Sequence, residues 1–106
     1  MFDPYCDHIT TEDPNMLVPW YLMSSYAYYI DSDPILSDGM YDELSKRLLR
    51  SWDDIVHQHK SHITKGDLEA GSFLGEYPSR ILGALYHVRR DKPQPPETMG
   101  SLEKFL

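Results

Sequence analysis

The segment Tyr26–Leu48, YAYYIDSDPILSDGMYDELSKRL, decides the fold of this chain. Its middle, Asp31–Pro34 (DSDP), is typical of a turn, because Asp and Ser side chains bond nearby backbone groups and Pro fixes φ. The proline also disfavours helical geometry at the residue before it, so a first helix should end near Asp31. The segment therefore predicts the end of one helix, a tight connection and the start of a second helix.

The second helix should have one apolar face and one polar face. Ser37 or Asp38 is expected to cap its start, where a carboxylate also suits the positive end of the helix dipole. Positions three and four apart are neighbours on a helix. On this spacing the apolar stripe consists of Met40, Leu44 and Leu48, and the polar face of Asp38, Tyr41, Asp42 and Ser45. Packing as a hairpin would bring several tyrosines of the first helix close to these aspartates.

The whole chain is predicted to be all-α, with a helical hairpin, a third helix packed across it and irregular ends. Residues 1–15 are expected to form an irregular lead-in, residues 16–90 the helical domain and residues 91–106 a Pro-rich tail. The first helix should begin at Met16 and the second should continue to about Gln58. A short capped turn is expected over Thr64–Gly71, and Pro78 should open the last helix, with a stripe of Ile81, Leu82, Leu85 and Val88.

Composition restricts the possible functions. The chain has 106 residues, of which 41% are hydrophobic, enough for one small domain with a modest core. A formal net charge of −7 argues against unaided binding to a nucleic-acid backbone. The single cysteine, Cys6, allows no internal disulfide and favours a reducing cytoplasm. No apolar run is long enough to span a bilayer, so no membrane association is expected.

Three further features of the sequence could form sites. The run His57-Gln58-His59-Lys60-Ser61-His62 has spacing that zinc could use, but without a cysteine partner it is more typical of a solvated surface, so no metal is expected. Arg80, near the positive end of the last helix, could hold a phosphate or could simply face solvent. Cys6 has only His8 as a basic neighbour in sequence and makes a poor nucleophile, so no catalytic residue is predicted.

The amino-acid sequence of the hairpin resembles a known family signature. Domain Ia, the small N-terminal helical domain of NAD-dependent DNA ligases, typically reads Y-[HY]-x-x-D-x-P-x-x-x-D-x-x-Y-D-x-L. This chain is similar without gaps at Tyr28, Tyr29, Pro34, Asp38, Tyr41, Asp42 and Leu44. Ser32 stands where the family often has Asp, and Tyr29 stands where it often has His. The match covers about a fifth of the chain.

The resemblance implies a nicotinamide site. In that family, domain Ia closes over the nicotinamide mononucleotide (NMN) half of NAD⁺ during self-adenylylation of the enzyme. By this likeness Tyr28 and Tyr41 would flank the nicotinamide, and Asp38 and Asp42 would engage its amide, ribose or cationic ring, with NAD as the cofactor. Tyr29 would replace a His that contacts the phosphate region. Aromatic faces and carboxylates suit a cationic ring on physical grounds as well.

The chain also lacks parts that a ligase needs. The K-x-D-G motif with the nucleophilic lysine is absent, and Lys65-Gly66-Asp67 does not replace it. The tail, with Ser101, Leu102 and Phe105, is faintly similar to the entry of the family's nucleotidyltransferase domain, P-M-L-S-L-x-x-x-F, with Gly100 where that motif has Leu. The chain is therefore not expected to catalyse ligation alone.

Three functions remain open from the sequence. The first is an NMN/NAD-recognising module, possibly the small subunit of a split NAD-dependent DNA ligase in DNA replication or repair, with a nucleotidyltransferase partner chain. The second is a non-catalytic interaction or regulatory protein that uses the same fold, and its tail, to dock on a ligase or another NAD-using enzyme. The third, a small hydrolase or transferase acting on a nicotinamide nucleotide, has no evident nucleophile.

Overall fold

The computed structural model describes residues 1–73 and 75–91. Within this part all regular structure is helical and no strand occurs, which confirms the all-α class. The α-helices are α1 (Asp3–Glu12), α2 (Leu17–Tyr29), α3 (Asp38–Arg50), α4 (Lys65–Ala70) and α5 (Ser79–Asp91). Single 3₁₀ turns cover Pro14–Met16, Trp52–Asp54 and Lys60–His62. None of the helices in the described ranges combines the length and apolar character that crossing a membrane requires.

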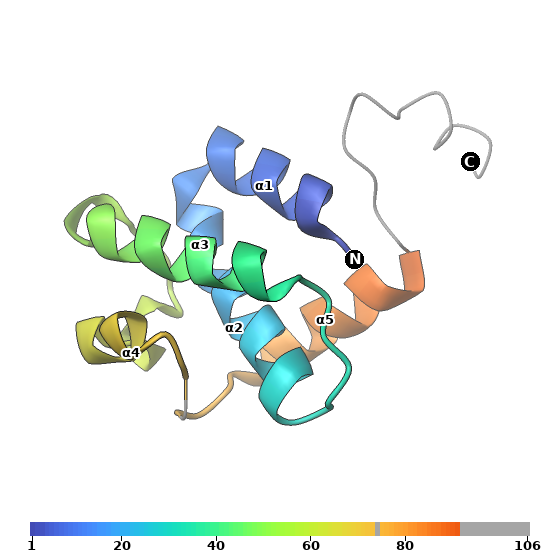
Figure 1. The fold of residues 1–106 in the computed structure, drawn as a ribbon. Coiled ribbons are helices and arrows are strands. Elements are labelled where there is room, and N and C mark those ends of the chain that lie inside the picture. The colour runs from blue at the N-terminus through green and yellow to red at the C-terminus, as the bar shows by residue number, and fades with distance from the viewer. Residues whose placement is uncertain (74, 92–106) are drawn as a thin grey trace.

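Helix α2 is the centre of the bundle (Figure 1). Ten of its thirteen residues are buried, so it has almost no solvent-facing side and needs other helices around it. The hydroxyls of Ser24 and Ser25 donate to the carbonyls of Trp20 and Tyr21, each over 2.7 Å, which allows both serines to be buried. Helices α3 and α5 pack on α2, and Tyr5 of α1 meets the Trp20 ring edge-on at 5.8 Å.

The predicted hairpin and third packing helix are both present. Leu44 and Leu48 of α3 are fully buried, as the apolar stripe requires. From α5, Ile81 and Leu85 enter the core, whereas Leu82 is 36% exposed and lies at the edge of the predicted stripe. The two apolar faces close on α2 from different directions, which completes the core.

The prediction of an irregular lead-in over residues 1–15 is wrong, because Asp3–Glu12 forms α1. This helix is held by partners distant in sequence. The Phe2 backbone N–H donates to the Ile35 carbonyl over 2.8 Å. The Asp3 carboxylate accepts from the backbone N–H and the hydroxyl of Ser37, over 2.9 and 2.5 Å. Figure 1 shows the resulting arrangement, with α1 beside α3. Because these partners lie more than thirty residues away, no local pattern in residues 1–15 predicts the contacts.

Helix α3 ends at Arg50, so the prediction that it continues to about Gln58 is also wrong. After a 3₁₀ turn the chain becomes extended at Ile55, whose side chain is 2% exposed. The Lys60 ammonium donates to the carbonyls of Trp52 and Ile55, over 2.5 and 3.1 Å. Ending α3 at Arg50 gives up further helical hydrogen bonds. Burial of Ile55 and the hydrogen bonds from Lys60 compensate for this loss.

Helix α4 forms where the sequence predicted a capped turn. The Thr64 hydroxyl accepts from the Asp67 N–H while the Asp67 carboxylate accepts from the Thr64 N–H, a complete capping box. Gly71 follows with φ of 72°, a left-handed conformation that glycine adopts without strain. The predicted tail lies outside the described residues from residue 92 onward, and so does its likeness to the nucleotidyltransferase entry.

We expect Asp3→Ala to destabilise the fold by about 1–3 kcal/mol, because the Ser37 hydroxyl and N–H lose a charged acceptor. Urea unfolding followed by circular dichroism measures this change. Glu12→Ala, which removes the same charge from an exposed position of α1, should have little effect. Equal losses in the two variants would mean that Asp3 acts only through net charge.

Candidate functional site

A pocket of about 200 Å³ opens at the corner between α2 and α3. The structure brings all of the sequence-predicted binding residues together on its wall: Tyr28, Tyr29, Asp38, Tyr41 and Asp42. The remaining lining residues are Ser24, Pro34, Leu36 and Gly71. Two helices, their connection and the end of α4 thus contribute to one concave surface.

Tyrosine rings form one side of the pocket. Tyr28 and Tyr29 meet edge to face with centroids 5.0 Å apart, and Tyr29 meets Tyr41 in the same way at 6.5 Å. Tyr28 is 47% exposed and Tyr29 37% exposed, which is unusual for large rings at the end of a buried helix. Both residues are therefore partly accessible to a ligand that enters the pocket.

Tyr41 is the fixed ring of this group. It stacks on the buried Tyr21 with centroids 5.4 Å apart and 13° between the planes. Its hydroxyl shares a 2.6 Å hydrogen bond with that of Ser25. A phenol is neutral at physiological pH even at its ordinary pKa near 10, and burial raises the pKa of Tyr41 further, so the ring adds an uncharged aromatic surface to the pocket wall.

The carboxylates come from the first turns of α3, before and after Tyr41 in the sequence. Ser37 is the N-cap and accepts from the Met40 N–H over 3.1 Å, which leaves Asp38 as the first helical residue. The Asp38 carboxylate has no hydrogen bond or ion pair within the described residues. Asp42 lies one turn later and pairs with Lys46 over 3.0 Å. Two acidic groups near the aromatic wall favour a cationic ligand.

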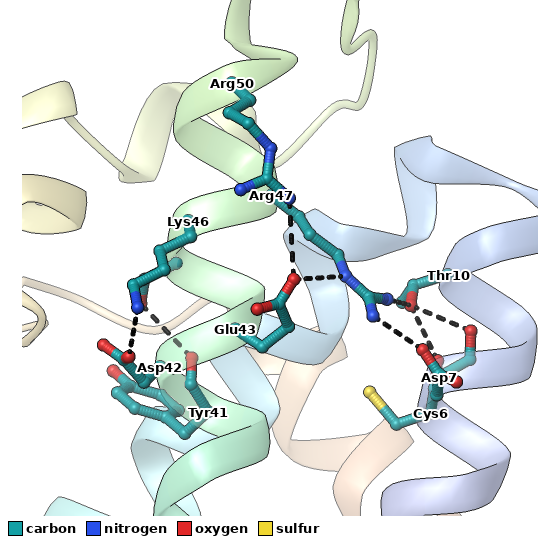
Figure 2. A network of polar contacts seen from close by, with 10 residues as sticks. Cys6, Asp7, Thr10, Tyr41, Asp42, Glu43, Lys46, Arg47 and Arg50 are labelled. Atoms are coloured by element: carbon teal, nitrogen blue, oxygen red, sulfur yellow. Dashed lines mark hydrogen bonds and ion pairs between the residues drawn. The ribbon is translucent and has the colours of Figure 1, made fainter.

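The opposite face of α3 has a different role (Figure 2). There Arg47 donates to Asp7 over 2.7 Å, to Glu43 over 3.1 Å and to Thr10 over 3.4 Å, which joins α3 to α1. The hydrogen bond from Arg47 lowers the pKa of Glu43. A second hollow of about 190 Å³ lies beside Arg47 and Arg50, but both guanidinium groups are already paired with acids. We interpret this face as structural.

The connection between α2 and α3 is held from α5. Arg89 donates to the Asp31 carboxylate and to the Asp33 carbonyl, each over 2.7 Å. Ser32 adopts φ of 53°, a left-handed conformation that is uncommon for a residue with a side chain. These contacts fix the turn just before Pro34, which lines the pocket.

The histidine run lies away from the pocket. His57, His59 and His62 gather with ring centroids 5.3 and 6.0 Å apart, yet no group in the described ranges has an arrangement that could hold a metal ion. Burial, followed by the neighbouring histidines and Arg80, lowers the pKa of His59. Arg80 is exposed on this side and is not among the pocket residues, so the geometry gives no support to its holding a phosphate there.

Cys6, a residue of α1, is fully buried, and burial raises its pKa to about 12. It therefore remains a thiol at physiological pH, the less reactive form.

Some pocket residues were missed by the sequence reasoning. Gly71 was expected only to end a helix, but α4 packs on α3 and carries it to the pocket. No sequence motif or spacing pattern singled out Ser24 or Leu36 as a binding residue. Only the spacing of Ser24 four residues before Tyr28 could have placed it on that face of α2.

Comparisons with known proteins identify no relative: no family model, curated protein or solved structure matches this chain.

Tyr77 is not among the pocket residues and provides a test of the packing. Its ring meets Tyr26 and Phe73 edge-on, both at 5.1 Å, and its buried hydroxyl has no hydrogen-bond partner within the described ranges. Burial, followed by the nearby Tyr41 and Tyr29, raises the pKa of Tyr77 from its ordinary value near 10 to about 12.

We expect Tyr77→Phe to protect the protein against alkaline unfolding. Between about pH 10 and pH 12 the unfolded chain loses the Tyr77 proton before the folded chain does, so stability falls by up to about 1.4 kcal/mol per pH unit for this group. The variant lacks that loss, and at pH 7 its stability should be unchanged or somewhat higher, because no hydrogen bond is lost and a buried hydroxyl without a partner is removed.

Urea unfolding at pH 7 and pH 11 measures both effects. Tyr86→Phe, at a ring that is 62% exposed, is the matched control and should behave as the unmodified chain does. The same pH dependence in all three proteins would contradict the pKa shift.

Proposed function

We propose that this chain recognises the nicotinamide mononucleotide half of NAD⁺ through the pocket between α2 and α3. The observation that carries the proposal is the convergence of Tyr28, Tyr29, Tyr41, Asp38 and Asp42 on one cavity. Oxidised nicotinamide is a flat cationic ring, which aromatic faces and carboxylates attract. A pocket that combines both is suited to this ring and poorly suited to a neutral or anionic one.

The size of the pocket supports a small ligand or part of a larger one. Its volume of about 200 Å³ lies below the range of about 300–1,000 Å³ that is typical of pockets for drug-sized ligands. The nicotinamide ring and its ribose would occupy it, and the adenylate half of NAD⁺ would remain outside. The resemblance to domain Ia of NAD-dependent DNA ligases, given above, points to the same half of the molecule.

In the wider role that we propose, the module presents the nicotinamide nucleotide to a nucleotidyltransferase supplied by a separate polypeptide, as in a split ligase. The 106 residues contain no K-x-D-G lysine, so the adenylylated nucleophile has to come from elsewhere. The module would contribute binding and orientation of the leaving NMN, and the partner would contribute the covalent chemistry.

Calorimetric titration of the purified chain with NMN, NAD⁺ and AMP tests the proposal. We expect NMN and NAD⁺ to bind and AMP not to bind. Asp42→Ala, Asp38→Ala and Tyr28→Ala should each weaken NMN binding at least about tenfold, which corresponds to about 1.4 kcal/mol. The folded state should persist in the Asp42→Ala and Tyr28→Ala variants, because both side chains are substantially exposed.

Asp53→Ala is the matched control, since it removes an exposed aspartate outside the pocket. Binding of NMN unchanged in Asp42→Ala, or absence of heat and thermal shift with both nicotinamide ligands, would contradict the proposal. The second result would favour the docking hypothesis, which a pull-down with the full chain then examines.

A further inference from the structure

The pocket lining has negative charges that attract a cation but no positively charged side chain to attract an anion. Its lining residues include two aspartates and no lysine, arginine or histidine. Nicotinamide mononucleotide carries both a cationic ring and an anionic phosphate. The same carboxylates that favour the ring would repel the phosphate, so a ligand of this class needs a positive group at the rim.

Lys46 is the cation nearest to the lining residues in the described contacts. Its ammonium lies 3.0 Å from the Asp42 carboxylate, one helical turn along α3. Figure 2 shows this pair on the face of α3 away from the Arg47 network. The side chains of Lys46 and Asp42 are 62% and 58% exposed, and an exposed pair at this spacing contributes little stability. The lysine can therefore leave Asp42 at small cost.

The two arginines that hold the hairpin are already paired with acids. Arg89 donates to the Asp31 carboxylate and to the Asp33 carbonyl, and it is half-buried. Arg47 is bound to acids on the opposite face of α3. Moving either guanidinium would give up two or more charged hydrogen bonds, whereas Lys46 would give up a single exposed ion pair.

We propose that Lys46 is the specificity residue for the ligand phosphate and that it exchanges Asp42 for that phosphate when ligand binds. The exchange has two effects that favour binding. The ammonium neutralises part of the phosphate charge, and the Asp42 carboxylate becomes free to face the cationic ring. The site then binds nicotinamide nucleotides that carry a 5′-phosphate in preference to nicotinamide riboside, which lacks this phosphate. This inference rests on the proposed function of the pocket.

The test compares the Kd values of NMN and nicotinamide riboside for the unmodified chain, Lys46→Gln and Arg50→Gln. Arg50 is the matched control because it lies on the same helix, is 65% exposed and, like Lys46, pairs with an acid of α3. Both variants lose one positive charge, so a difference between them is a local effect. We expect the unmodified chain to prefer NMN about tenfold or more, and this preference should weaken as salt is raised.

In Lys46→Gln the ratio of the two Kd values should fall towards one, through weaker binding of NMN, while riboside binding is unchanged or slightly tighter. Arg50→Gln should retain the original ratio. A ratio that is unaffected in Lys46→Gln, or equally reduced in both variants, would overturn the role of Lys46 and leave the proposed function intact. No binding of either ligand to the unmodified chain would overturn both.

Discussion

The structure depends on a helix that has almost no surface. Helix α2 is apolar on nearly every side, and the hydroxyls of its two buried serines donate to backbone carbonyls of the same helix. Such a helix is stable in water only when neighbours cover every side of it. Helices α3 and α5 pack on it, and α1 contacts it where the Tyr5 ring meets the Trp20 ring of α2. The need to bury α2 thus explains why so short a chain forms several helices around one centre.

The candidate pocket follows from where that burial stops. Near its carboxyl end α2 passes out of the core, and Tyr28 and Tyr29 become partly exposed. The chain turns there and begins α3 with acidic residues. The turn is held at one end by Arg89 of α5 and at the other by Asp3 of α1, which binds Ser37. The pocket is therefore shaped by elements from both ends of the described chain, although its lining comes mostly from the hairpin.

The electrostatics of α3 divide along its two faces. On one face Arg47 connects Asp7, Glu43 and Thr10 and fastens α1 to α3. On the other, Asp38 has no partner within the described residues and Asp42 has only an exposed lysine. Stability is obtained from the first face, so the charges of the second face remain available to a ligand.

The sequence by itself determined the helical class, the hairpin over Tyr26–Leu48 and the cap that opens α4 at Thr64. These features are set by contacts within a few residues, which local patterns record. The resemblance of the sequence to the domain Ia signature also selected Tyr28, Tyr29, Asp38, Tyr41 and Asp42 as one group, and all five line the pocket. What binds there stays a prediction.

Only the tertiary structure decided the rest. The helix α1, the end of α3 at Arg50 and the position of Gly71 at the pocket all depend on contacts between residues far apart in sequence. The raised pKa of Tyr41 has the same origin, since it comes from burial against other helices. Such effects follow from how whole helices pack, and no local pattern of side chains specifies that packing.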